Sequence, residues 1–169
     1  MKRLMALLLA VLMIGAVLAA CGDSKDENRT VKTSVSEKYD DGYAKKYADN
    51  VSKDDDGNTS YEFTGKKYDE YVTDHANDVS KEITSEVKDD MGVDFGQYTQ
   101  VRPNEKAVII GVNPGKYDAA KAEAAAPSYA ESAFKVFMAL EEPVSTITVK
   151  YVNANNQDEV YGTFEVTAK

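Results

Sequence analysis

Residues 65–89 constrain the fold more than any other stretch, because their apolar residues recur with the period of an α-helix. Lysines and acidic residues occupy the opposite side of that helix. Thr64 is a suitable N-cap, and the pattern stops at Gly92. We therefore expect a long amphipathic helix from Gly65 to about Asp89. Its apolar stripe consists of Tyr68, Tyr71, Val72, Ala76, Val79, Ile83 and Val87.

Strand signals lie on both sides of this helix. Residues 48–64 alternate around an Asp-Gly turn at 54–58, which predicts a β-hairpin. Residues 97–102 are typical of a half-exposed strand, and 103–106 have turn chemistry. Residues 107–112 form a continuous apolar run, which favours a central strand covered on both faces.

The C-terminal third predicts a second helical region and a closing hairpin. Residues 116–126 are Ala-rich and helical in character, and Pro127 should end or kink that helix. Ser128 and Glu131 match a capping box, so we expect a new helix there. Its apolar stripe comprises Tyr129, Ala133, Phe134, Val136, Phe137 and Leu140. Two alternating strands, 144–152 and 159–168, follow with a polar loop at 153–158 between them.

Residues 31–47 are ambiguous. Tyr39, Tyr43 and Tyr47 are spaced by four, which suits one face of a short helix, but they also suit an irregular segment that leads into a strand. The remaining elements follow the order hairpin, helix, strand pair, helix, hairpin. This order predicts a single α+β domain over residues 31–169. We expect a two-layer sandwich in which two main helices pack on one face of an antiparallel or mixed sheet of hairpins.

The N-terminus has the layout of a secretory signal peptide: a positive start, an uncharged apolar run to residue 20, and small residues at its end. The run is short for a transmembrane helix, which needs about 20 apolar residues. Its last residues, Leu18-Ala19-Ala20-Cys21, resemble the lipobox of bacterial lipoprotein precursors. An ordinary cleaved signal or an uncleaved membrane anchor is the alternative.

The lipobox resemblance implies that Cys21, the only cysteine, receives a diacylglycerol group and that a signal peptidase cuts between Ala20 and Cys21. The mature chain would then be held at the cell membrane by acyl chains such as palmitate, facing outside the cytoplasm. Two or more chains are needed for stable anchoring, because one chain binds only marginally. Residues 21–30 are polar and predict a flexible tether.

The charge of the mature chain restricts its partners. Without residues 1–20, 18 basic residues stand against 29 acidic ones, a formal net charge of −11. Such an acidic chain is not expected to bind nucleic acid or to dock electrostatically on anionic lipid. An acidic face could attract a basic partner, although solubility alone also explains the charge.

Two sets of residues invite a site assignment. Asp54 and Asp56 lie in the hairpin turn, but an EF-hand alignment that uses Gly57 as its sixth position fails at Ser52 and Phe63. They are therefore weak metal candidates within a turn. His75, the only histidine, has no second histidine or available cysteine to complete a metal or catalytic set. We expect it to be a packing residue at the margin of its helix.

The sequence contains no recognisable catalytic or cofactor motif, so we expect no enzyme activity and no cofactor. The preferred hypothesis is a lipid-anchored, non-catalytic binding or interaction module, whose partner is an unidentified envelope protein. The alternative is an accessory protein that binds a small ligand or cation in a pocket between sheet and helices. A purely structural envelope protein is a third possibility.

Overall fold

The computed structural model of the chain describes residues 27–169 and confirms the α+β class. The predicted signal peptide, the cleavage site at Ala20 and the lipidation site at Cys21 lie outside the described residues. The elements in chain order are β1 (Thr30–Val35), the 3-10 helix η2 (Tyr43–Lys46), β2 (Asn50–Lys53), β3 (Thr59–Thr64), α2 (Gly65–Met91), β4 (Gly96–Arg102), the 3-10 helix η3 (Pro103–Glu105), β5 (Ala107–Val112), α3 (Ala119–Phe137), β6 (Thr146–Asn153) and β7 (Asn156–Thr167).

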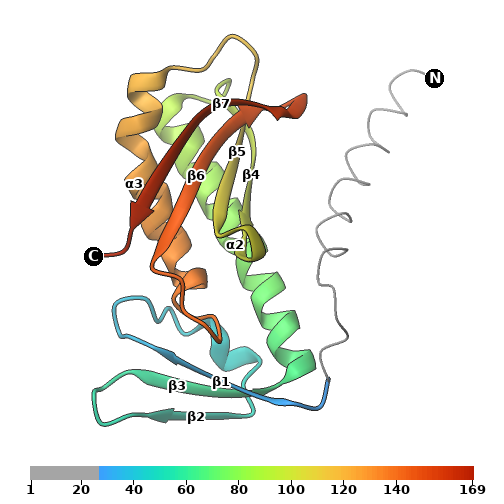
Figure 1. Cartoon of the computed structure of the whole chain (residues 1–169), viewed down its shortest axis with the longest axis vertical. Coiled ribbons are helices and arrows are strands. Elements are labelled where there is room, and N and C mark those ends of the chain that lie inside the picture. The colour runs from blue at the N-terminus through green and yellow to red at the C-terminus, as the bar shows by residue number, and fades with distance from the viewer. Residues whose placement is uncertain (1–26) are drawn as a thin grey trace, which may run out of the picture.

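A four-stranded mixed sheet forms the larger part of the molecule, with the strand order β4-β5-β6-β7 (Figure 1). The outer pairs β4–β5 and β6–β7 are antiparallel, whereas β5 and β6 are parallel. Parallel neighbours need a crossover, and α3 provides it between β5 and β6. All six residues of β5 are buried, which confirms the prediction of a central strand.

Both helices pack on one face of this sheet. Val108, Ile110 and Val112 of β5 share one hydrophobic core with the apolar stripes of α2 and α3. The other face carries a small apolar cluster of Ala107, Ile109 and Val152.

A hydrogen-bonded group of side chains covers part of that second face. Arg102 of β4 donates to Gln100 and Glu105, and it also reaches Gln157 of β7 at 2.9 Å. Because β4 and β7 are the two edge strands, this last bond crosses the sheet, and the tip of the β6–β7 hairpin bends toward β4 (Figure 1). These polar side chains therefore cover part of the second face.

A separate three-stranded antiparallel sheet, with the order β1-β3-β2, lies at the end of the molecule where α2 begins (Figure 1). Its core-facing residues include Val31, Tyr61 and Phe63. A second sheet follows from the length of α2: 27 residues span about 40 Å, whereas strands of six to eight residues span about 20–27 Å. The apolar stripe of α2 is therefore longer than one sheet can cover, and the second sheet buries its first turns.

The hairpin at 48–64 and the first long helix are confirmed as β2–β3 and α2. Thr64 occupies the N-cap position of α2, but its side chain makes no capping hydrogen bond. In the ambiguous segment, β1 was not predicted, and the tyrosines at 43 and 47 bracket a single 3-10 turn. The predicted tether also reaches too far, because Thr30 begins β1 and Arg29 pairs with Glu141 at 2.8 Å.

The predicted break at Pro127 is wrong. One helix, α3, continues through Pro127, and it is capped at its start by Asp118, whose side chain accepts from the backbone N–H groups of Ala120 and Lys121. Pro127 is exposed, so water can bond the carbonyl that its missing N–H leaves free. Buried Ala126 and Tyr129 on either side continue one apolar stripe, and tertiary packing overrides the local signal.

The last hairpin is tighter than the sequence indicated, and the polar loop predicted at 153–158 is wrong. β6 extends to Asn153 and β7 begins at Asn156, so most of that loop is strand. The register shifts between the pairs Tyr151–Gly162 and Val152–Val160, which leaves Tyr161 as an extra residue. This bulge moves Tyr161 next to Tyr117, with the two rings stacked at 5.4 Å.

Candidate functional site

The predicted metal candidates serve the turn in which they lie. Asp54 Oδ1 accepts from the backbone N–H groups of Asp56 and Asn58, and Asp54 Oδ2 accepts from the Asn58 side chain and from Ser34 of β1. These bonds lower the pKa of Asp54, the bond from the Asn58 side chain most of all. Over residues 27–169 no group of three or more His, Cys, Asp or Glu side chains is arranged to hold a metal ion.

His75 lies inside the molecule rather than at the margin of its helix, with 2% of its surface exposed. Its Nε2 lies 2.9 Å from Asp41 Oδ2, and its Nδ1 lies 3.3 Å from the Tyr71 hydroxyl. An ionised carboxylate can only accept, so Nε2 donates to Asp41, and Nδ1 shares the second hydrogen bond with the Tyr71 hydroxyl. The Tyr43 ring stacks on the imidazole at 4.5 Å, with 7° between the planes. His75 is thus a packing residue, as predicted, whose two nitrogen atoms both have partners.

Asp41 remains ionised in this environment. Burial opposes its charge, but the hydrogen bond from His75 and a second one from the Tyr43 backbone outweigh that effect and lower the pKa of Asp41. The Asp41 side chain is one-third exposed, so water reaches the carboxylate from one side. The imidazole therefore connects α2 to the segment between β1 and β2 through its hydrogen bond to Asp41.

Two further tyrosine–aspartate pairs extend this connection to the surface. The Tyr43 hydroxyl donates to Asp78 at 2.9 Å, and the Tyr47 hydroxyl donates to Asp74 at 2.7 Å. Both tyrosines are half-buried and both aspartates are exposed, and the two rings stack at 5.9 Å. We call these four residues the tyrosine–aspartate surface.

The hydroxyl groups of this surface stay protonated. Burial and then the hydrogen bond to Asp78 raise the pKa of Tyr43 far above its usual value. The hydrogen bond to Asp74 is the main reason that the pKa of Tyr47 is raised. The pKa of Asp78 is lowered, first by its hydrogen bond from Lys81 and then by that from Tyr43. The surface therefore combines two neutral aromatic rings with fixed negative charge.

An ammonium group from the same chain already occupies part of this surface. Lys46 Nζ lies 4.0 Å from the centroid of the Tyr43 ring. Attraction between a cation and the negative face of an aromatic ring accounts for that position, and Lys46 also lowers the pKa of Asp78 through its charge. Chemically, the arrangement can hold an ammonium or guanidinium group between a ring face and a carboxylate.

The sequence carried a signal for this surface that the predictions did not use. Tyr43 and Tyr47 are four residues apart, and so are Asp74 and Asp78, so each pair lies on one side of its helical turn. Matched spacing of donors and acceptors on two elements is consistent with pairing, but it does not show that the elements meet. The long-range contact between η2 and α2 supplies that information.

A different hollow, of about 310 Å³, lies at the turn between α2 and β4. This hollow lies where α2 ends and the chain turns into β4. The small-ligand hypothesis predicts a pocket between the sheet and the helices instead. The apolar lining of the hollow includes Val93, which is 75% exposed. The residues around it are Met91, Gly92, Val93, Asp94, Phe95 and Lys116.

No family model matches the chain, and no curated protein or solved structure is significantly similar to it. A functional proposal must therefore rest on the sequence and on the geometry of the structure. Within residues 27–169, neither of the two α-helices is both apolar enough and long enough to span a bilayer.

Proposed function

We propose that this chain is a lipid-anchored binding module at the outer side of the cell membrane, and that it binds a basic group of its partner on the tyrosine–aspartate surface. The anchor rests on the resemblance of Leu18-Ala19-Ala20-Cys21 to a lipobox. The binding surface rests on one observation: a half-buried tyrosine pair, fixed by two aspartates, already holds the Lys46 ammonium against the Tyr43 ring.

The environment of His75 supports binding rather than catalysis. A general base or nucleophile must reach the reacting atom of a substrate. The imidazole is 2% exposed, and the Tyr71 ring beside it is equally enclosed. Its Nε2 atom is engaged by Asp41 and its Nδ1 atom by Tyr71. These contacts favour a role for His75 in holding the binding surface in place.

The chemistry of the surface favours a cationic occupant. Asp74 and Asp78 are exposed and negative, and the Tyr43 ring already accommodates one cation, Lys46 Nζ. A basic side chain of an envelope protein could displace Lys46 and pair with Asp78 at the same time. A free organic ammonium ligand would use the same contacts, which is the form that the small-ligand alternative takes here.

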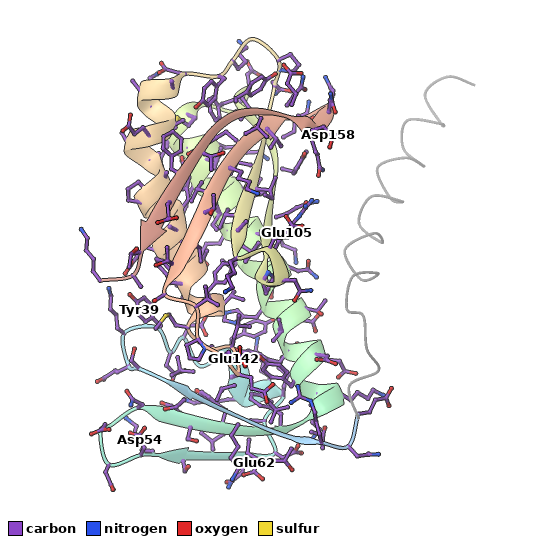
Figure 2. All side chains as sticks on the ribbon, viewed as in Figure 1. Tyr39, Asp54, Glu62, Glu105, Glu142 and Asp158 are labelled. Atoms are coloured by element: carbon purple, nitrogen blue, oxygen red, sulfur yellow. The ribbon has the colours of Figure 1, made fainter. Side chains whose placement is uncertain are left out.

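Calorimetric titration of residues 27–169 with hexalysine tests the binding surface. Asp74→Asn together with Asp78→Asn should weaken hexalysine binding at least tenfold. Asp94→Asn together with Asp158→Asn changes the net charge by the same amount away from this surface, because Asp94 follows the C-terminal end of α2 and Asp158 lies at the start of β7 (Figure 2); this pair should change the affinity less than twofold. Equal losses in the two double variants would mean that net charge alone attracts the peptide, and the proposed surface would be wrong.

Two further measurements define the ligand. Lys46→Ala frees the Tyr43 ring face and should strengthen hexalysine binding several-fold, and a decrease would contradict the displacement of Lys46. Titration with tetramethylammonium distinguishes a small ligand from a peptide. If its affinity equals that of hexalysine divided by the number of cationic groups, a free small ligand is favoured, and a much lower affinity favours a peptide.

The anchor has its own test, because Cys21→Ala should abolish lipidation and cleavage before residue 21.

A further inference from the structure

The four-stranded sheet has two edges, and they differ in how they are protected. At the β4 edge, α2 lies alongside the strand, and the backbone N–H of Val101 donates to Ser80 Oγ of that helix at 2.8 Å. At the other edge, β7 is the longest strand described, with 12 residues. An edge strand presents a row of backbone donors and acceptors that can pair with another strand.

The register of the β6–β7 ladder shows which backbone groups face outward. Ala168 N–H donates to the Ser145 carbonyl, and the same antiparallel register pairs Val166 with Ile147 and Phe164 with Val149. Hydrogen-bonded and non-hydrogen-bonded pairs alternate along such a ladder. Phe164 and Val166 therefore direct their backbone groups toward β6, and Thr163, Glu165 and Thr167 direct theirs away from it. Within residues 27–169 no hydrogen bond to these outward backbone groups is found.

The usual protections of an edge strand are sparse in this stretch. Proline and lysine are absent from Asn156–Thr167, and the bulge at Tyr161 lies before the regular part of the strand. Between Gly162 and Thr167 the only charge is Glu165. Thr163 and Val166 are β-branched and suit an extended strand.

The side chains favour one way of pairing this edge with a second copy of itself. An antiparallel pair centred on Phe164 places Phe164 opposite Phe164 of the other copy and Thr163 opposite Glu165. An antiparallel pair centred on Glu165 instead places two carboxylates directly opposite each other, which is unfavourable. Phe164 is half-buried against Tyr151, with ring centroids 5.8 Å apart, so part of its ring remains available for a partner.

We propose that two copies of this chain pair antiparallel along β7, centred on Phe164, so that their sheets join into one continuous eight-stranded sheet. The outward backbone groups of Thr163 and Glu165 supply the hydrogen bonds, and the two phenylalanine rings pack across the symmetry axis. Because each copy is acidic, the copies repel one another, and added salt strengthens the dimer.

Sedimentation equilibrium of residues 27–169 tests this pairing, since every described element and the whole core lie in that range. The protein should form a dimer whose dissociation constant falls as salt is added. Thr163→Pro removes an outward N–H from each copy without removing a bond to β6, and should raise the dissociation constant at least tenfold. Thr163→Ala keeps the N–H and should change it less than threefold. Equal effects of the two variants, or a monomer at every concentration and salt level, would overturn the proposal.

Oxidative cross-linking tests the register and does not depend on the proline variant. Residues 27–169 lack cysteine, so an introduced cysteine is the only thiol. In the Phe164-centred pair, the two residues 164 are directly opposite each other, about 4.5 Å apart at Cα, which is within reach of a disulfide. Phe164→Cys should therefore cross-link, whereas Thr163→Cys should not, because its copies are diagonal. Cross-linking of the Thr163 variant alone, or of neither variant, would overturn the Phe164-centred pairing.

Discussion

Replacing His75 by Phe keeps an aromatic ring on Tyr43 and removes both hydrogen bonds of the imidazole. Asp41 then loses its hydrogen bond from Nε2 but keeps the one from the Tyr43 backbone, and the Tyr71 hydroxyl loses its partner at 3.3 Å. Asp41 can turn to water because its side chain is one-third exposed. The Tyr71 hydroxyl cannot do so, because Tyr71 is 2% exposed. The substitution therefore leaves the Tyr71 hydroxyl without any partner, whereas Asp41 can replace its lost hydrogen bond with one to water.

The magnitude follows from these environments. A hydrogen bond to a charged group contributes about 1.5–3 kcal/mol, and partial exposure of Asp41 reduces this to about 1–2 kcal/mol. An unsatisfied buried hydroxyl costs about 1–2 kcal/mol more. His75→Phe should lower the free energy of unfolding by about 2–4 kcal/mol, which lowers the melting temperature by about 5–14 °C in a chain of this size.

Urea unfolding of residues 27–169, followed by circular dichroism, measures this change. Tyr71→Phe alone should cost about 1 kcal/mol, because it leaves Nδ1 of His75 without its hydrogen-bond partner. The double variant should cost about 1 kcal/mol less than the sum of the single variants, because their shared hydrogen bond is lost only once. A His75→Phe variant within 0.5 kcal/mol of the wild-type chain, or strictly additive single variants, would refute the idea that these bonds fix the segment to α2.

Three other outcomes follow from local features. Burial raises the pKa of Asp41, but the hydrogen bond from His75 helps to hold it below the usual aspartate value of about 3.9, and the resulting stability is present above that value and is lost as pH falls through the lower folded pKa. Asp41→Asn should therefore make the free energy of unfolding depend less on pH at acid pH, as measured by urea titrations over a pH series. An unchanged pH dependence would contradict this. Pro127→Ala restores a helical hydrogen bond and should stabilise the chain by about 1–2 kcal/mol, measured by calorimetry, after the greater freedom of the unfolded chain is deducted; a lower melting temperature would count against it. A Cβ at Gly111 would overlap the ring of Tyr98, so Gly111→Ala should cost about 1–3 kcal/mol in urea unfolding, and less in a Tyr98→Ala background; an equal cost in both backgrounds would disprove the overlap.

Elements with a strong local period could be predicted from the sequence. The stripe of α2 and the apolar run of β5 were placed correctly because each extends over most of its element. β1 was missed because only Val31 and Val35 mark its buried face, with buried Thr33 between them. A buried threonine is read as polar in a sequence, although it fits a strand well.

The parts of the candidate site could be predicted only singly. Tyr43 and Asp78 lie 35 residues apart in the chain, and local patterns do not report which elements meet over such a separation. His75 was correctly assigned to packing, but its bond to Asp41 depends on the path of the segment between β1 and β2. Pro127 shows the opposite error, in which a strong local signal is overridden by burial on both sides of it.

The position of β1 determines how the domain responds to mechanical force. The chain enters beside the start of α2, where Lys66 N–H donates to the Glu27 carbonyl and Gly65 N–H donates to the Arg29 carbonyl. Thr30 at the start of β1 is paired with Thr64 at the end of β3, so a pull on the N-terminal segment loads the β1–β3 ladder at one end. Its hydrogen bonds would break one after another, as in peeling, rather than all together, as in shear. The small sheet would thus open at low force, before the four-stranded sheet and its two helices.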